Sequence, residues 1–370
     1  LGYGLFLARL NSADKALITL SNAKKYIPSN FELIHELVSF LDEMDKPEYN
    51  RIKWLIEEIL SLMNTLDLAS IIENLSFTKK QRKLWAQTEE ERLLFSKDPY
   101  VYFYEDFLKV YDKKMRKSRG VYYTPRPVVN FIIRAINDIL QDTFGIKKGL
   151  ADRKRVTALD FATGTGSFIL EVLHQIYDVT NEGLRDAVIR EHALKNLYGF
   201  EYLIAPYTIS HLKLSQFLHD NGYILQHNER LQIYLTNTLE PIDAQPNYLL
   251  PALSKEVELA QKVKDKHILV ITGNPPYSGH SKNPSFIIKN ILSKDGKKNK
   301  KQKSFTFIGK LIEDYKKVDG KPLGEKNPKW LQDDYVKFIR YAQWKMDQVD
   351  EGVVGIITNH SFLDNTTFRG

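Results

Sequence analysis

The amino-acid sequence predicts an α/β fold, in which a doubly wound, mostly parallel sheet is covered by helices and preceded by an all-α helical domain. Over about the first hundred residues, apolar side chains recur at helical spacing, and glycine and proline are sparse. From Gly120 onward, strand-like and helix-like segments alternate, which is typical of a parallel sheet with helical crossovers. We therefore expect a helical domain over residues 1–117 and a sheet domain over residues 118–370.

Within the helical domain, residues 31–41 and 52–63 have the apolar spacing of amphipathic helices. The tyrosine-rich stretch at residues 100–108 is interpreted as a packing helix rather than a ligand site. No acidic or basic pair in this domain stands out as chemically active, so the sequence assigns it no function.

The sheet domain opens with a proline-bearing stretch, which is followed by an amphipathic helix over residues 129–140. Strands are predicted at residues 156–162, 197–201, 231–236, 268–272 and 353–358, and helices at residues 168–177 and 205–218. In such sheets, ligands bind outside the carboxyl ends of the strands. The polar segments that follow the first four strands are therefore the candidate functional site.

Composition excludes several classes of site. The chain has no cysteine, which excludes disulfides and thiolate metal sites, and its nine histidines are scattered without a close pair, so we expect no metal site. No apolar run reaches the ~18 residues of a membrane helix, and no signal peptide is recognisable. We expect a cytoplasmic protein without a membrane partner. The chain begins at Leu1 and stops at Gly370, and we expect it to be part of a longer protein.

The chain is basic, with a formal net charge of +7 at pH 7 and a sequence pI near 9.1. This balance weakly favours a polyanionic partner. The densest basic run, residues 294–303, contains six lysines in ten residues. Two interpretations stay open for this run, namely a solvated surface loop and a loop that contacts phosphates.

The first strand of the predicted sheet ends in the sequence DFATGTGSF, residues 160–168. Gly164 and Gly166 allow the turn to pass close to a ligand, while the next helix presents its N–H groups. The spacing is not GxGxxG, and neither GKS nor GKT follows, which disfavours a dinucleotide site and a P-loop. Alone, a glycine turn of this kind indicates a nucleotide-like ligand only weakly.

Polar residues also follow the next three strands. Glu201 ends the second strand, where an acidic side chain can accept hydrogen bonds from both hydroxyls of a ribose; the alternative is a surface glutamate. The sequence TNTLEP, residues 236–241, follows the third strand, and its short polar groups suit an adenine edge. The sequence NPPY, residues 274–277, follows the fourth strand.

The NPPY segment is rigid for a loop. Proline fixes its own φ and forces the preceding residue into an extended conformation, so Asn274 and Pro275 are both held extended. Two interpretations compete. The segment is either a strand-ending loop that happens to be rigid, or a loop that aims hydrogen-bond acceptors and an aromatic ring at a substrate.

Taken together, these motifs resemble a known enzyme family. GVYYTPRPVV, DFATGTGSF, GFE, TNTLEP and NPPY occur here in the order found in the gamma group of amino-methyltransferases, which methylate adenine N6 in DNA. YGLFLARL, FYEDFLKVYDKKMRKSRGVYYTP, NPKWLQDDYVKFIRYAQWK and ITNHSFLDNTTFRG are similar to single-chain restriction-modification enzymes of the type ISP and type IIG kinds. The resemblance implies a Rossmann-like, class I methyltransferase fold with S-adenosylmethionine as cofactor.

The resemblance also implies duplex DNA as the substrate. In such enzymes a nuclease and often a helicase motor lie upstream, and a target-recognition domain lies downstream. Residues 1–117 would then be a helical coupler, and the methyltransferase domain would lack its last two strands and the recognition domain. We therefore expect this chain to bind S-adenosylmethionine and yet fail to methylate DNA by itself.

The functional residues of the family carry over to matching positions. The methionine part of the cofactor would be cradled by Asp160, Ala162, Gly164, Gly166 and Phe168, and covered by Tyr123, Thr124 and Pro125. Glu201 would hold the ribose, and the cofactor's adenine would be bordered by Asn237, Thr238 and Leu239. The flipped target adenine would be handled by Asn274, Pro275, Pro276 and Tyr277.

The implied chemistry depends on hydrogen-bond acceptors. The amino nitrogen of adenine is a poor nucleophile, and the Asn274 side-chain oxygen and the Pro275 carbonyl would accept its two protons while Tyr277 stacks on the base. Two alternatives stay open: a protein glutamine N5-methyltransferase, which also uses NPPY to hold a planar amide, and a non-catalytic coupler or scaffold with a cofactor-binding domain. The YYTP segment, residues 122–125, and the basic insertion disfavour the glutamine enzyme.

Overall fold

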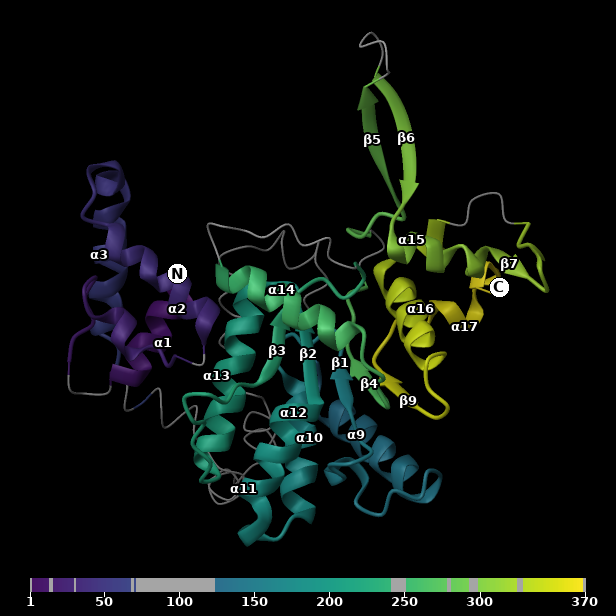
Figure 1. Ribbon diagram of the computed structural model, residues 1–370, viewed down its shortest axis with the longest axis horizontal. Helices are drawn as coiled ribbons and strands as arrows, with labels where there is room; N and C mark the ends of the chain where they lie inside the picture. The colour runs from purple at the N-terminus through teal and green to yellow at the C-terminus, as the bar shows by residue number, and fades with distance from the viewer. Residues whose placement is uncertain are drawn as a thin grey trace, which may run out of the picture.

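A five-stranded parallel sheet forms the centre of the molecule (Figure 1). The computed structural model describes residues 2–12, 16–29, 31–67, 70, 124–240, 251–277, 281–292, 299–324 and 329–368. The strands pair in the order β3-β2-β1-β4-β9, and each neighbouring pair is parallel. Their bounds are Ala158–Asp160 for β1, Leu197–Glu201 for β2, Gln232–Leu235 for β3, Val270–Gly273 for β4 and Val353–Ile356 for β9.

The strand order confirms the doubly wound sheet. From β1 the chain winds outward through β2 to β3, and it then crosses back to place β4 on the other side of β1. The direction of winding therefore reverses between β1 and β4, which is the point where ligands bind in sheets of this type. All five predicted strands are present, with β1 shorter than the predicted 156–162.

Helices cover both faces of the sheet because alternate strand residues point to opposite sides. On one face, Ala158 and Val270 join a core with the helices α9 Arg126–Asp142, α10 Ser167–Val179 and α13 Ile204–Asp220. On the other face, Leu159 and Ile271 pack with the helices α14 Pro251–Lys264, α15 Phe307–Ile312 and α16 Asp334–Met346. The three helices predicted in this domain correspond to α9, α10 and α13.

The N-terminal part of the chain is helical where the structure describes it. Its helices are α1 Gly2–Ser12, α2 Glu32–Ser39 and α3 Asn50–Asn64, which confirms the two amphipathic helices predicted from the sequence. They share their own apolar core and contact the sheet domain through α2, where Glu36 accepts a hydrogen bond from the Ala252 N–H at 2.7 Å. The tyrosine-rich stretch at 100–108 lies outside the described residues.

A β-hairpin replaces part of the loop that was predicted at residues 294–303. Strands β5 Phe286–Leu292 and β6 Asn299–Phe305 pair antiparallel and project away from the sheet domain (Figure 1). The loop interpretation was wrong for residues 299–303, because it weighed only the charge of the run and not the strand-forming sequence FIIKNIL opposite it. The Lys303 ammonium lies 3.7 Å from the centre of the Phe286 ring, so the lysine also supports the pairing.

The remaining elements are short. In the part of the chain that the structure describes they include, besides several 3₁₀ turns and one π-helical turn, α11 Arg185–Val188, α12 Leu194–Asn196, the two-stranded pair β7 Lys317–Val318 and β8 Lys321–Pro322, and α17 Ser361–Asp364. Among the described helices, none is long and apolar enough to cross a membrane.

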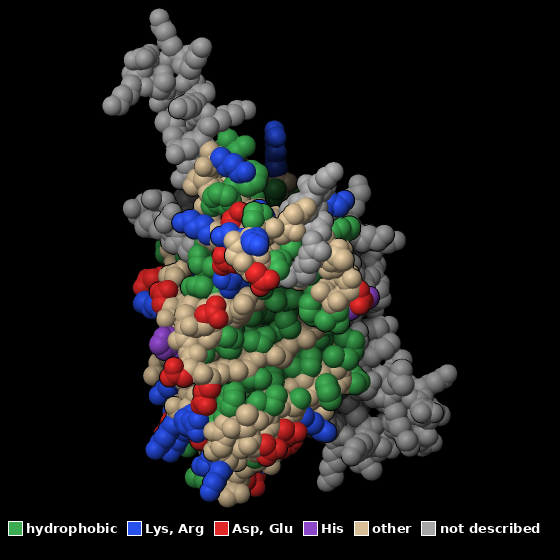
Figure 2. All heavy atoms as spheres, turned by 90° about the vertical axis from the view of Figure 1, so that its right-hand side faces the viewer, with side chains coloured by type: hydrophobic (Ala, Val, Ile, Leu, Met, Phe, Trp, Pro, Cys, Tyr) green, Lys and Arg blue, Asp and Glu red, His purple; other side chains and the backbone are tan. Residues whose placement is uncertain are grey.

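Strand β9 lies at an edge of the sheet and pairs on one side with β4. Apolar side chains gather on this face of the molecule (Figure 2), and Phe131 of α9, Val354 of β9 and Leu363 of α17 are exposed. An open edge strand beside apolar surface is prone to association with another chain.

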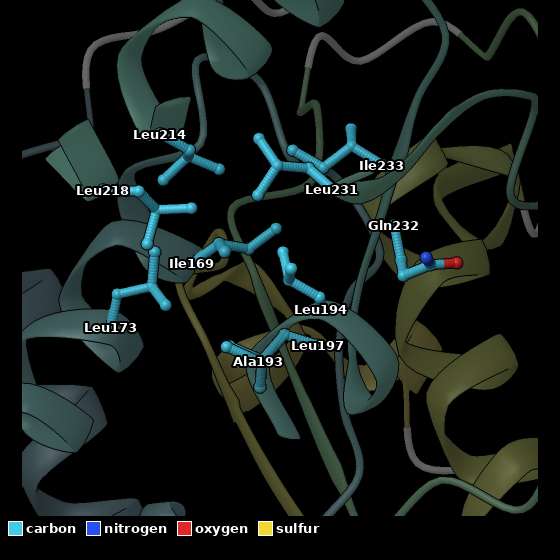
Figure 3. Close-up of a pocket in the computed structure, with 10 residues that line it drawn as sticks. All are labelled: Ile169, Leu173, Ala193, Leu194, Leu197, Leu214, Leu218, Leu231, Gln232 and Ile233. Carbon is cyan, nitrogen blue, oxygen red and sulfur yellow. The ribbon is translucent and has the colours of Figure 1, made fainter. Parts of the chain in front are cut away.

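A small cavity lies inside the core rather than at the ends of the strands that carry the polar motifs. It is lined by leucines of α10 and α13 and by the residues that open β2 and β3 (Figure 3), and its volume is about 10 Å³. Such a volume holds at most about one water molecule, and the lining is apolar except for Gln232. The cavity is therefore a packing gap and not a candidate cofactor site.

Candidate active site

The carboxyl ends of the first four strands meet at one edge of the sheet. In the parallel register, Asp160 of β1 is level with Gly199 of β2 on one side and with Thr272 of β4 on the other. The segments that follow β1, β2, β3 and β4 therefore leave the sheet side by side. The structure thus brings together the polar residues that the sequence analysis placed at strand ends.

The turn after β1 adopts the conformation that its glycines allow. Gly164 and Gly166 have φ angles of 54° and 79°, in the left-handed region that other residues rarely adopt. A side chain at Gly166 would also contact Ser210 of α13 at 3.2 Å, whereas one at Gly164 would meet no atom within 4 Å. The backbone at Gly164 therefore faces open space, as a turn that receives a ligand requires.

Asp160 is a buried carboxyl group that is only partly satisfied. The side chain is 1% exposed, and its Oδ1 accepts a hydrogen bond from the Ala162 N–H at 3.2 Å. Its Oδ2 is buried and has no hydrogen-bond partner within the described part of the chain. Burial, reinforced by the nearby Glu201 carboxyl, raises the pKa of Asp160 to about 8. A ligand that brings an N–H group or a positive charge to Oδ2 would relieve both the missing bond and the cost of ionisation.

Glu201 is tied to the backbone through both carboxylate oxygens. Oε2 accepts a hydrogen bond from the Gly164 N–H at 2.8 Å, and Oε1 accepts one from the Leu203 N–H at 2.6 Å. Burial raises its pKa to about 7, and these backbone bonds act in the opposite direction. Glu201 is thus not the surface glutamate of the alternative reading. A third backbone bond comes from Tyr202, so the carboxylate, which has about four acceptor sites, keeps one of them for a ribose hydroxyl.

The loop after β3 is held mainly by contacts within the protein. The Thr238 hydroxyl donates to the Phe161 carbonyl at 2.6 Å, and Leu239 is fully buried. The Asn237 Oδ1 accepts the Leu239 N–H at 3.1 Å, and the buried Lys264 amine donates to the Asn237 carbonyl at 2.6 Å. The loop is therefore fixed before any ligand binds, and its place beside the cofactor's adenine stays a prediction.

The NPPY segment presents a free acceptor. The Asn274 Nδ2 donates a hydrogen bond to the Thr124 hydroxyl at 3.1 Å, while its Oδ1 is buried and has no hydrogen-bond partner among the residues that the structure describes. The Thr124 contact thus directs the amide nitrogen away and leaves the oxygen available. Pro275 is buried, and Pro276 and Tyr277 are half-buried, with Tyr277 packed against the core around α16.

Several other predicted site residues have structural positions. Phe168 is 2% exposed in the core beneath the glycine turn, and Pro125 begins α9 as its N-cap residue. Tyr123 lies outside the described residues. Thr124 was assigned to the cofactor by resemblance, and the contact that the structure gives its hydroxyl is to Asn274.

Gly273, the residue before NPPY, was not predicted to belong to the site. Its φ is 143°, and a side chain there would come within 2.9 Å of the Asp160 Oδ1 and 2.8 Å of the Phe161 ring. Only glycine lets the fourth strand pass so close to the first. The signal was available, because a glycine directly before a rigid segment often marks a close backbone approach.

The two buried carboxyl groups predict an unusual pH dependence of stability. Asp160 and Glu201 have pKa values near 8 and 7 when folded, against about 4 in an unfolded chain. The folded state therefore holds protons that the unfolded state releases, so the free energy of unfolding should fall as the pH rises from about 5 to about 8. Urea unfolding at several pH values should show this fall, and it should be shallower in Asp160→Asn. Parallel pH dependences for the two proteins would contradict the buried carboxyl.

Comparison with known proteins identifies a family and a fold. The N-6 DNA Methylase family matches residues 96–322, which is more than half of the chain. No curated protein sequence matches. Among solved structures, the cryoEM structure of the DrdV–DNA complex has a TM-score of 0.61 at 23% identity, covering 99% of this chain and 31% of that chain.

Two Type ISP restriction-modification enzymes are also similar in structure. LlaBIII bound to DNA, an ATP-dependent enzyme, has a TM-score of 0.55 at 23% identity, covering 99% of this chain and 24% of that chain. A nuclease-deletion mutant of LlaGI, in complex with a DNA substrate mimic, has a TM-score of 0.52 at 24% identity, with coverages of 99% and 27%. At such identities these structures share the fold, and the chain spans between about a quarter and a third of their lengths. On the family match, the chain belongs to the N-6 DNA Methylase family.

Proposed function

We propose that this chain, acting within a larger enzyme, transfers a methyl group from S-adenosylmethionine to N6 of a flipped adenine in duplex DNA. The observation that carries the proposal is the buried Oδ1 of Asn274, which has no partner among the described residues and whose amide is oriented by Thr124. Family membership supports a DNA methylase acting at N6. It does not favour the glutamine N5-methyltransferase alternative.

The residues after β1 and β2 fit the cofactor. S-adenosylmethionine supplies an electrophilic methyl group on a positively charged sulfonium. The Asp160 Oδ2 lacks a partner, the Gly164 backbone faces open space, and Glu201 has acceptor capacity left. In the proposal, Asp160 and the glycine turn hold the methionine part, and Glu201 holds the ribose. The fixed β3 loop, with Asn237, borders the cofactor's adenine.

Asn274 and Pro275 act on the target amino group. Its lone pair is delocalised into the adenine ring, so the nitrogen attacks poorly until its geometry changes. The Asn274 Oδ1 and the Pro275 carbonyl accept one N–H each, which draws the nitrogen toward a tetrahedral shape and frees the lone pair. Acceptors lower the barrier in this way only if they are fixed beforehand. The two prolines and the Thr124 contact provide that fixation.

The target base must leave the duplex to reach these acceptors, as in other methyltransferases that act on bases. Tyr277, half-buried beside the acceptors, offers a ring on which the flipped base stacks. Stacking on an aromatic side chain is worth about 1–3 kcal/mol per base, comparable with the few kcal/mol lost on unstacking.

We propose further that the chain is the modification part of a single-chain restriction-modification enzyme. The similar structures are larger proteins, and two of them are named as Type ISP enzymes. In this proposal residues 1–117 are a helical coupler and residues 118–370 belong to the methyltransferase domain. A nuclease or helicase would precede the chain, and a recognition domain would follow it.

Replacing Asn274 tests the proposed chemistry. In the intact protein, Asn274→Ala should lower methyl transfer to unmodified duplex DNA by at least about 100-fold, because a fixed acceptor for the developing charge is lost. S-adenosylmethionine affinity, measured by calorimetry, should stay within about twofold, since Asn274 acts on the target base. Tyr277→Phe, which keeps the stacking ring, serves as the matched control and should retain most activity. Turnover of Asn274→Ala near the unaltered rate would refute the acceptor role.

The β5–β6 hairpin supplies a second test of DNA as the substrate. It projects from the molecule in the segment that follows NPPY, and its strand β6 carries part of the lysine-rich run (Figure 1). We propose that these lysines contact DNA phosphates. Each such contact contributes about 0.9 to the slope of log affinity against log salt concentration.

Neutralising the lysines of β6 should therefore make DNA binding less sensitive to salt. The intact protein would carry glutamine in place of Lys300, Lys301 and Lys303, and the control would carry it at the exposed lysines before β1, Lys147, Lys148 and Lys154. Fluorescence anisotropy with mixed-sequence duplex should show a salt slope reduced by up to about 3 in the first variant and little change in the second. Equal slopes in all three proteins would remove the hairpin from the interface.

A further inference from the structure

The segment that follows NPPY is bound to the first turn of α16 by a cluster of polar contacts. Asp334, 5% exposed, accepts hydrogen bonds at Oδ1 from the Ser281 hydroxyl at 2.6 Å and from the Asn283 Nδ2 at 3.1 Å. Its Oδ2 accepts the Lys282 N–H at 3.2 Å. One carboxylate thus gathers three donors from three consecutive residues of the loop.

Lys337, one turn further along α16, binds the same loop. Its amine donates hydrogen bonds to a hydroxyl and a carbonyl oxygen of that loop. The side chain is fully buried, and its amine donates to the Ser281 hydroxyl at 2.7 Å and to the Asn283 carbonyl. Burial lowers the pKa of Lys337 to about 8, and the carboxylates of Asp334 and Asp333 act in the opposite direction. A buried amine is retained only where its hydrogen bonds are made, so these contacts are specific.

Asn283 extends the cluster to the loop after β3. Its Oδ1 accepts a hydrogen bond from the Asn237 Nδ2 at 2.7 Å, and the Asn237 Oδ1 in turn accepts the Leu239 N–H at 3.1 Å. A continuous chain of hydrogen bonds therefore runs from α16 through the loop after β4 to the loop after β3. Helix α16 also touches the end of β1, where the Phe338 and Phe161 rings meet edge to face at 5.0 Å.

We propose that Asp334 and Lys337 are positioning residues for methyl transfer. Through their hydrogen bonds they fix the loop after β4 relative to the loop after β3. In the proposed function the first loop binds the target base and the second borders the cofactor, so base and cofactor keep one relative position. This inference rests on the proposed function. Transfer requires the reacting atoms to lie about 3–3.5 Å apart and in line, and a misplacement of about 1 Å can cost about 100-fold in rate.

The same helix offers a matched control. Lys345 is also fully buried on α16, and its amine donates to the Lys264 carbonyl at 2.8 Å and the Lys266 carbonyl at 2.5 Å. These acceptors belong to the end of α14 and the connection to β4, so Lys345 anchors the opposite end of α16. Replacing Lys337 or Lys345 by methionine removes a buried amine in both cases, but only Lys337 contacts the two-loop cluster.

The activity test compares Asp334→Asn, Lys337→Met and Lys345→Met in the intact protein, with rates expressed per folded molecule. We expect kcat to fall by about 10- to 100-fold in the first two variants, because the loops after β3 and β4 lose their fixed relative position. Lys345→Met should lower the midpoint of urea unfolding and leave kcat within about twofold. An equal loss of kcat in Lys345→Met, or none in the other two, would overturn the positioning role.

Hydrogen exchange tests whether these hydrogen bonds fix the two loops, and it does so without any methyl transfer. In this chain, Lys337→Met should speed amide exchange of Leu239, which lies beyond Asn283 and Asn237 in the chain of hydrogen bonds, whereas Lys345→Met should not. Unchanged exchange at Leu239 in Lys337→Met would show that these hydrogen bonds do not fix the loops, even in an active enzyme. If exchange changes as expected but the intact protein transfers no methyl group to DNA, the proposed function is wrong. The two residues would then fix the loops without a role in methyl transfer.

Discussion

The site depends on buried hydrogen-bond acceptors that no other described residue satisfies. Leaving a buried polar atom without a partner costs about 1–3 kcal/mol, so a fold retains such atoms where the surrounding structure fixes them firmly. Asn274 Oδ1 and Asp160 Oδ2 are two such atoms, and both lie at the carboxyl ends of central strands. Asn274 is held by Thr124 and by rigid prolines, and Asp160 by its own turn. A target base would supply the missing hydrogen-bond donor to Asn274, and a cationic cofactor would supply the missing partner to Asp160.

The rest of the domain keeps these acceptors in place. Parallel pairing brings the strand ends level, and the winding of the chain reverses between β1 and β4, the point where ligands bind in sheets of this type. Glycine at position 273 allows the fourth strand to pass close to Asp160, whereas the backbone at Gly164 faces open space. Buried ionisable side chains connect the surrounding elements by hydrogen bonds. Glu201 of β2 binds the turn after β1, and Lys264 of α14 binds the loop after β3.

Much of the fold could be predicted from the sequence because its signals are local. Alternating strands and helices, the glycine turn and NPPY all lie in short stretches, and the five strands and three helices that were predicted for the sheet domain appear where they were expected, whereas α14, α15 and α16 were not predicted. The rest depends on distant partners. Thr124 meets Asn274, and Asp334 meets Ser281 and Asn283, across separations that no local pattern encodes. The hairpin was not predicted, because the lysine-rich sequence of β6 was interpreted as a loop and its pairing with the less charged β5 was not considered.

The central claim is that the strand ends form a site for a cationic cofactor, with Asp160 and Glu201 as its buried acids. Calorimetric titration of this chain with S-adenosylmethionine at pH 7, in two buffers of different ionisation enthalpy, tests it most directly. Burial leaves both carboxyls largely or partly protonated, with pKa values of about 8 and 7, and a bound cation lowers them. We expect saturable binding with net release of up to about 1.4 protons. Absence of binding, or binding without proton release, would contradict it.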